Sequence, residues 1–127
     1  MAEINYETTR ILVIEDEIHI RKIICRLLRQ IGYRLIDEAA DGSEGFKTLL
    51  RVQLDVIHME PVDGITFLRK LRALSQPKYA AQPVIFLTGD TDSTTVIAAK
   101  DLRVDGYLVK PVSLNALKDR IEAVLSR

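Results

Sequence analysis

Short apolar runs alternate along the chain with longer stretches of helical periodicity. The first run, Ile11–Ile14, is apolar throughout, which is typical of a strand buried on both faces. Apolar residues then recur at helical spacing from Ile18 to Ile31, and Gly32 provides a natural stop. The alternation continues in four more cycles. It predicts further strands at Tyr33–Glu38, Leu54–Met59, Val84–Leu87 and Gly106–Val109.

Polar residues between these runs predict where the later helices begin. Ser43 is the expected N-cap of the second helix, and Ser113 that of the last. The turn 61–64 leads into a third helix, and a fourth is expected around Val96–Leu102. We interpret Ser75–Gln82 as a loop, because prolines stand close to both of its ends.

Five strand–helix cycles with short apolar strands favour a parallel sheet covered by helices on both sides. The expected fold class is therefore α/β, a flavodoxin-like, doubly wound (βα)5 sheet with strand order 2-1-3-4-5. We find no internal repeat or linker in the sequence. The chain is thus expected to form a single domain over residues 1–127, with residues 1–9 as an N-terminal extension.

Composition excludes several classes of protein. The formal net charge is zero, with 18 basic and 18 acidic residues, so bulk charge favours neither nucleic acid nor an anionic membrane. No apolar run approaches the roughly 20 residues of a membrane span. Cys25 is the only cysteine, which excludes an internal disulfide and the usual cysteine-based zinc sites. Met1–Arg10 lacks the apolar core of a signal peptide, so we expect a cytoplasmic protein.

Polar side chains follow three of the predicted strands directly. Glu15 and Asp16 follow the first strand, Thr88 the fourth and Lys110 the fifth. The carboxyl ends of parallel strands form the ligand-binding edge of such sheets. Paired carboxylates suit Mg²⁺, while a hydroxyl and an ammonium group suit phosphoryl oxygens. Each has a plainer interpretation: acids at a helix N-terminus, a capping threonine, and a surface lysine before Pro111.

Together these residues resemble the receiver domain of response regulators in two-component and chemotaxis signalling. The resemblance extends over nearly the whole chain from Arg10, and it implies a signalling module that is not an enzyme. It implies that Glu15 and Asp16 bind Mg²⁺ and that Thr88 and Lys110 contact a phosphoryl group. It also implies that Tyr107 switches between outward and inward rotamers. The matching segments are Glu15-Asp16, Asp41-Gly42, Met59–Gly64, Thr88-Gly89 and Tyr107–Pro111.

The same resemblance implies partners. A histidine kinase or phosphotransfer protein would donate the phosphoryl group, and an unidentified output protein would respond to it. The output face would consist of the helix around Val96–Leu102, the strand Gly106–Val109 and the last helix, and it could also form a homodimer. Neither direct nucleic-acid binding nor membrane association is expected.

The family's third strand ends in the aspartate that is phosphorylated, and no aspartate matches it here. Counting forward from Asp55 places Glu60 at the acceptor position. Counting back from the turn motif instead indicates a short deletion between Ile57 and His58, and we prefer this second register. It builds the third strand from Leu54–Met59, which puts His58 in or beside a buried layer.

Three functional hypotheses follow. The leading one is a phosphoryl-accepting receiver that switches partner binding. The second is a receiver-like binding module that cannot be phosphorylated, because the acceptor aspartate is absent. A small flavodoxin-like enzyme or nucleotide binder is disfavoured, since Glu15-Asp16-Glu17 would repel a phosphate where such proteins carry a glycine-rich loop.

Overall fold

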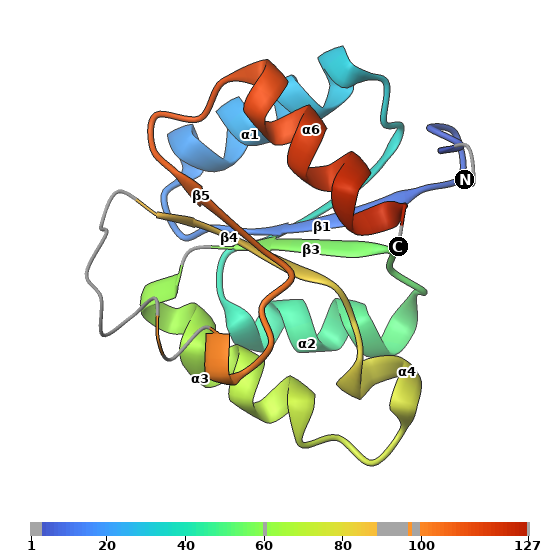
Figure 1. Cartoon of the computed structure of the whole chain (residues 1–127), viewed down its shortest axis with the longest axis vertical. Helices are drawn as coiled ribbons and strands as arrows, with labels where there is room; N and C mark the ends of the chain where they lie inside the picture. The colour runs from blue at the N-terminus through green and yellow to red at the C-terminus, as the bar shows by residue number, and fades with distance from the viewer. Residues whose placement is uncertain (1–3, 60, 89–96, 98–99, 127) are drawn as a thin grey trace.

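A five-stranded parallel sheet forms the centre of the protein. The computed structural model describes residues 4–59, 61–88, 97 and 100–126, with the main chain alone at 61–63 and 88. The strand order is β2-β1-β3-β4-β5, as the sequence predicted (Figure 1). The strands are β1 (Arg10–Ile14), β2 (Leu35–Ala39), β3 (Val56–Met59), β4 (Val84–Thr88) and β5 (Gly106–Val109).

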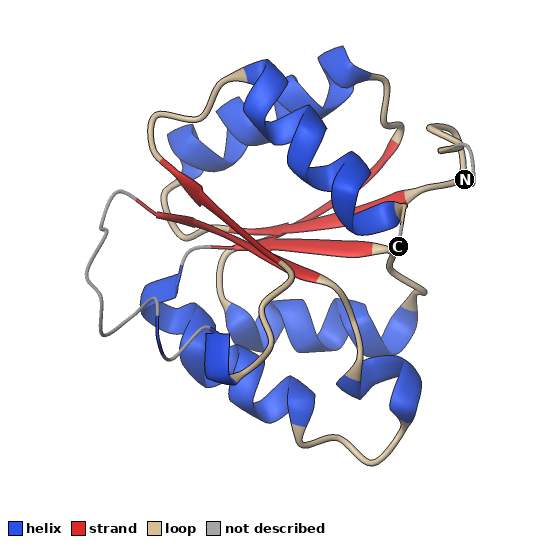
Figure 2. Cartoon of the chain, in the orientation of Figure 1, coloured by secondary structure: helices blue, strands red, loops and turns tan. Residues whose placement is uncertain are grey.

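Helices cover both faces of this sheet, giving the doubly wound arrangement (Figure 2). Helices α1 (Ile18–Ile31) and α6 (Leu114–Leu125) lie on one face. The other face carries α2 (Gly42–Arg51), α3 (Pro61–Arg72) and α4 (Pro77–Ala80). Of the helix expected around Val96–Leu102, the described residues Ile97, Lys100 and Asp101 are helical. Among the described residues, no helix is long and apolar enough to cross a bilayer.

Two hydrophobic cores lie against the two faces of the sheet. Successive strand residues point to opposite faces. Ile11 and Val13 of β1 therefore join the core beneath α1 and α6, whereas Leu12 and Ile14 join the core against α2 and α3. These four side chains of β1 are almost completely buried. This explains why the central strands are continuous apolar runs.

Several element boundaries match the sequence prediction and others do not. Gly32 ends α1 with φ of 130°, and Ser113 caps α6 through the N–H of Ala116, both as expected. The cap of α2 is Asp41 rather than Ser43, because the Asp41 carboxylate accepts the N–H of Glu44. Strand β2 starts at Leu35, since the N–H of Tyr33 still closes the end of α1.

The predicted loop Ser75–Gln82 contains the short helix α4, so this part of the prediction was wrong. Pro77 occupies one of the first helical positions, where a missing N–H costs nothing and a fixed φ favours the helix. In the sequence, a proline at this position is typical of a loop. The same residue equally permits a helix start.

Strand β3 runs through the position at which we placed a short deletion, between Ile57 and His58. Strand β3 passes through both residues without interruption, and Ile57 and His58 pair with consecutive residues of β1 and of β4. Met59 ends the strand opposite Ile14, and α3 begins at Pro61. Glu60 stands between the two elements in the sequence and lies outside the described residues. A continuous strand is compatible with either register, so the deletion stays a prediction.

Candidate functional site

An acid from β1 and a lysine from β5 meet at the carboxyl edge of the sheet. The side chain of Glu15 is only 3% exposed, and its Oε1 lies 3.8 Å from Nζ of Lys110. Two strands, β3 and β4, separate β1 from β5 in the sheet, so this contact spans the edge. The Lys110–Pro111 peptide bond is cis. We call Glu15, Asp16 and Lys110 the charge site.

The main chain and α1 fix the position of Glu15. Its N–H donates to the carbonyl of Ala39, which continues the pairing between β1 and β2. Its carboxylate accepts the N–H of Glu17 at 3.2 Å, and its carbonyl accepts from Nη1 of Arg21 at 2.8 Å. Glu15 is therefore held by three elements before any ligand is considered.

Arg21 is a site residue that the sequence analysis missed. Besides Glu15, its guanidinium contacts the carboxylate of Glu38 at 3.1 Å, and Lys22 contacts the same carboxylate at 3.0 Å. Partial burial raises the pKa of Glu38, but the hydrogen bonds from Lys22 and Arg21 outweigh it and lower that pKa. The only feature of the sequence that pointed to this role was the adjacent pair Arg21-Lys22, about one turn into the predicted helix.

The three consecutive acids after β1 divide into two roles. Glu17 caps α1, and the N–H groups of His19 and Ile20 lower the pKa of its carboxyl. The plainer interpretation, acids at a helix N-terminus, thus applies to Glu17. Asp16 is exposed and makes no hydrogen bond or ion pair with the residues that the structure describes. Its carboxylate is therefore available to a ligand beside Glu15.

This donor set fits a hard divalent cation that keeps most of its water. Mg²⁺ is commonly bound by one or two carboxylates, with water filling the other positions. Glu15 and Asp16 are adjacent in the chain and supply such oxygens, one buried and one exposed. Over the described part of the chain, no cluster of three or more acidic, histidine or cysteine side chains could hold a metal. The protein would thus supply few of the ligands.

The structure describes the other predicted site residues to different extents. Thr88 is the last residue of β4 and pairs with Val109, directly before Lys110, but its side chain is not among those described. Tyr107 is half-buried, with its ring edge against Phe86 at a centroid distance of 6.5 Å. Glu60, the nearest acid to the expected acceptor position, lies outside the described residues.

A buried histidine lies close to the charge site. His58 is 1% exposed, between Val13 of β1 and Ile85 of β4, which confirms that it belongs to a buried layer. Neither of its ring nitrogens has a hydrogen-bond partner among the described residues. Burial lowers the pKa of His58 to about 4, and the positive charge of Lys110 contributes, although contact with its own main chain opposes the shift. The imidazole is therefore neutral at physiological pH.

Comparison with known proteins gives the same assignment along the whole sequence. The family described as "Response regulator receiver domain" matches residues 11–122. The chemotaxis protein CheY of Pseudomonas aeruginosa is 33% identical over 122 residues, which cover 93% of this chain and 97% of that protein. CheY-3 of Vibrio cholerae is 29% identical over 131 residues, covering all of this chain and 99% of the relative.

Solved structures agree with the fold. The chemotaxis response regulator CheY4 of V. cholerae superposes with a TM-score of 0.81 at 28% identity, covering 92% of this chain and 98% of the other. The receiver domain of the sensor histidine kinase PA1611 from P. aeruginosa gives 0.82 at 28% identity, covering 94% and 98%. That structure is described with a magnesium ion coordinated in its active-site cleft.

Proposed function

The chain belongs to the receiver-domain family of response regulators, a signalling module like CheY, and from this premise we propose that it binds partners without aspartate phosphorylation. In this proposal the charge site holds Mg²⁺, and the protein serves as a binding module in a cytoplasmic two-component or chemotaxis pathway. The single observation that carries the proposal is the end of β3. The strand ends at Met59, α3 begins at Pro61, and no aspartate stands between them.

Retained carboxylates support the Mg²⁺ part of the proposal. Glu15 and Asp16 would hold the ion, which when bound would offset the negative charge gathered at this edge of the sheet. The magnesium described for the PA1611 receiver supports the same expectation for a relative of equal fold. The ammonium group of Lys110 already stands 3.8 Å from Glu15, so part of this charge is balanced without any phosphoryl group. A module that works unphosphorylated needs such a balance.

The output face supports the partner part of the proposal. Two of its described apolar side chains are strongly exposed, Ile97 at 58% and Val109 at 48%. An output protein, or a second copy of this chain, would cover them. A histidine kinase or phosphotransfer protein remains the expected upstream contact. Tyr107 would act here as a fixed part of this face rather than as a phosphorylation-driven switch.

The second candidate function is phosphoryl acceptance from a histidine kinase, with Glu60 as the acceptor by spacing. It is favoured by the survival of the Glu15–Lys110 contact across two intervening strands. Thr88 and Lys110 would then contact the phosphoryl oxygens, and positioning and electrostatics would do most of the catalysis. Glutamate is one methylene longer than aspartate, which places its carboxylate differently relative to the same fixed groups.

Acetyl phosphate with Mg²⁺, followed by intact mass measurement, distinguishes the two candidates. We expect no phosphoryl adduct on the wild-type chain, but Mg²⁺-dependent amide shifts near Glu15 and Asp16 in NMR spectra. Asp16→Asn should reduce those shifts. Glu60→Asp restores the family's residue type directly after β3 and is the matched variant in which an adduct can form. A wild-type adduct that disappears in Glu60→Gln would establish the second candidate instead.

A further inference from the structure

An apolar side chain stands unusually exposed on the helical layer formed by α2, α3 and α4. Leu50 of α2 is 64% exposed, more than any other large apolar side chain that the structure describes. It lies on the opposite face of the sheet from α1 and α6 (Figure 1). We call the area around it the α2–α4 surface, defined by Lys47, Leu50, Arg51, Lys70 and Lys78.

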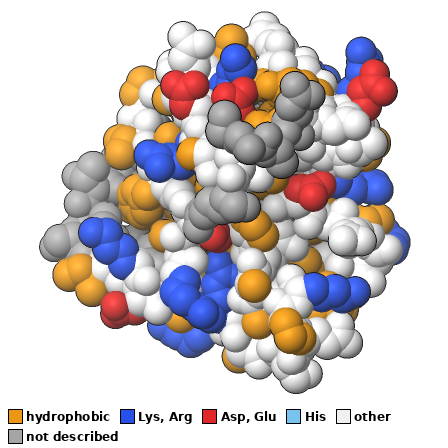
Figure 3. Space-filling view, turned by 45° about the vertical axis from the view of Figure 1, so that its right-hand side comes forward, with side chains coloured by type: hydrophobic (Ala, Val, Ile, Leu, Met, Phe, Trp, Pro, Cys, Tyr) orange, Lys and Arg blue, Asp and Glu red, His pale blue; other side chains and the backbone are white. Residues whose placement is uncertain are grey.

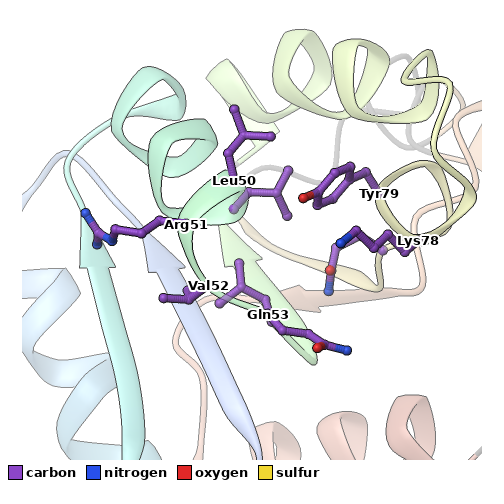
Figure 4. Close-up of a pocket in the computed structure, with 9 residues that line it drawn as sticks. Leu50, Arg51, Val52, Gln53, Lys78 and Tyr79 are labelled. Atoms are coloured by element: carbon purple, nitrogen blue, oxygen red, sulfur yellow. The ribbon is translucent and has the colours of Figure 1, made fainter.

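Two hollows flank Leu50, and it lines both. The first lies between α2 and α3, has a volume of about 630 Å³ and includes Phe46 and Phe67. The second lies between the end of α2 and α4, has a volume of about 190 Å³ and includes Tyr79. Figure 4 shows Tyr79 and Lys78 reaching from α4 toward the end of α2 that carries Leu50. A protruding Leu50 between two concavities is a shape that suits an irregular peptide.

The rim of these hollows is basic. Lys47 and Lys70 line the first, and Arg51 and Lys78 line the second, with Arg51 directed away from α4 (Figure 4). None of the four forms an ion pair with any carboxylate that the structure describes. In the view of Figure 3, basic side chains lie across the lower half of the molecule, with hydrophobic ones between them.

Among the described residues that line the two hollows, the single acid is already engaged. Asp41 lines the first hollow, but its carboxylate caps α2 by accepting the N–H of Glu44. The chain as a whole is neutral, so four cations without a described carboxylate partner around one apolar protrusion represent a local separation of charge. One of the four, Lys78, lies over the ring of Tyr79 at 4.8 Å from its centroid. Such a surface is complementary to an acidic partner.

A buried amide gives an independent indication of a ligand. Gln82 lines the second hollow and is only 5% exposed, and its Nε2 has no hydrogen-bond partner among the residues that the structure describes. Leaving a buried donor unsatisfied is costly, and most such groups in proteins have a partner. Because Nε2 itself is inaccessible, an acceptor oxygen in this hollow would satisfy the amide once the Gln82 side chain turns toward it. Carboxylates and peptide carbonyls both provide one.

We propose that the α2–α4 surface binds an acidic peptide segment of a partner protein that carries a large apolar side chain. The apolar side chain packs against Leu50 and Tyr79. Acidic residues on either side pair with Lys47 and Lys70 in one direction and with Lys78 in the other. A carboxylate or carbonyl oxygen of the segment accepts the hydrogen bond from Gln82.

The α2–α4 surface shares no residue with the charge site, so the inference does not depend on the function proposed above. Its second hollow lies where α2 and α4 lead into the amino ends of β3 and β4, whereas the charge site lies at the carboxyl edge. Its first hollow extends along α2 as far as Asp41, which follows the carboxyl end of β2. A flat anionic bilayer could pair with the cations but could not fill two concavities beside Leu50. A nucleic acid backbone offers no apolar group for Leu50 and Tyr79.

A peptide library displayed on phage, selected against the immobilised full-length chain, tests the proposal. We expect the enriched sequences to combine glutamate or aspartate with a large apolar residue. A synthetic fluorescent version of the strongest binder then gives the affinity by anisotropy. Leu50→Glu and Lys70→Glu should each weaken binding by about tenfold. Replacing the acidic residues of the peptide by glutamine should do the same, and added salt should weaken the original peptide.

Matched controls separate this surface from general stickiness. Ile23→Glu changes another exposed apolar helix residue, 52% exposed on α1 at the other face, and should leave the affinity unchanged. Gln82→Leu removes the buried donor while keeping apolar volume, and should weaken binding by about threefold to tenfold. Circular dichroism checks that each variant is folded. If Gln82→Leu does not fold, Lys47→Glu, a change at an exposed residue, takes its place as the second test of this surface.

Three results would overturn the proposal. The first is selection of peptides without acidic residues, or of peptides whose binding ignores Leu50→Glu and Lys70→Glu. The second is failure to select any peptide, with binding instead to phosphatidylserine vesicles that Leu50→Glu abolishes, which would identify a lipid surface. The third is a concentration-dependent dimer in light scattering that Leu50→Glu dissociates, which would identify a second copy of this chain as the occupant.

Discussion

Arg72 of α3 and His58 of β3 are both buried polar side chains, but they differ in how fully their polar atoms are hydrogen-bonded. Arg72 donates five hydrogen bonds. Four go to the carbonyls of Ala80, Gln82, Leu102 and Arg103, and the fifth goes to the carboxylate of Asp105. His58 has two ring nitrogens, and neither has a hydrogen-bond partner among the described residues.

Their positions in the fold explain the difference. Arg72 reaches the loops that enter β4 and β5, where carbonyls have no strand partner and can accept from a side chain. Asp105 completes the cluster by also accepting the N–H of Val84. His58 lies in the middle of the sheet, where the ladder already uses the backbone groups and the neighbours Val13 and Ile85 are apolar. Irregular chain, rather than the sheet, supplies partners for buried polar groups.

The largest effect is expected from Arg72→Met. Removing the guanidinium takes one donor from each of four carbonyls and from the Asp105 carboxylate, which keeps the N–H of Val84, and the removed side chain is only 8% exposed. Breaking a buried charged pair on one side typically costs about 3–5 kcal/mol of stability. Urea unfolding at neutral pH measures this loss. Arg69→Met, an exposed change on the same helix, is the control and should cost under about 0.5 kcal/mol. Equal losses in both variants would show that the hydrogen-bond cluster contributes little.

The next effect is a pH dependence that belongs to His58. Its pKa is about 4 in the folded protein against 6.5 as the ordinary value. The unfolded chain therefore binds a proton at His58 more readily, and the folded state loses stability as the pH falls from 6.5 to 4. A shift of this size corresponds to about 3 kcal/mol over that window. Unfolding free energies of the wild type and of His58→Leu, measured against pH across this range, isolate the contribution of His58, because the other groups titrate in both proteins. If the two curves of free energy against pH ran parallel, His58 would not contribute to the pH dependence.

At pH 7.5 the same His58→Leu variant should be more stable than the wild type. The neutral imidazole already costs free energy there, because its nitrogens have no partner among the described residues while the side chain is buried. Leucine has a similar volume and no polar atoms, so we expect a gain of about 1–3 kcal/mol. Thermal unfolding measures it. His58→Ala is the matched control: it removes the same polar atoms but leaves a cavity, and it should destabilise. A loss of stability in His58→Leu would indicate that His58 has a partner after all.

The sequence predicted the fold well because the fold depends on periodicity. Continuous apolar runs such as Ile11–Ile14 need burial on both faces, and only a sheet between two helical layers provides it. The strand order then followed from the short connections and the handedness of parallel crossovers. The helix α4 was missed because one turn of helix carries no periodicity, and Pro77 permits both a loop and a helix start.

The candidate site was predictable only in part. Residues placed directly after strands could be read from the sequence, and Glu15 and Lys110 do meet. The role of Arg21 could not be read from the sequence, since it depends on how α1 lies against β2 and Glu38. The register of the third strand against the family stays a prediction, because the pairing of β3 with β1 describes this chain alone and fits both ways of counting.

The smallest effect is expected where a charged pair is well made but accessible to solvent. Arg10 and Asp37 form a two-pronged contact between β1 and β2, with N–O distances of 2.7 and 3.3 Å, yet their side chains are 34% and 20% exposed. Water competes for both groups, so Asp37→Asn should cost at most about 1 kcal/mol, far less than Arg72→Met. The loss should shrink further in high salt, since screening weakens exposed pairs more than buried ones. Urea unfolding of both variants at low and high salt makes the comparison. A cost for Asp37→Asn that equals that of Arg72→Met and ignores salt would mean that burial does not determine how much these arginines contribute.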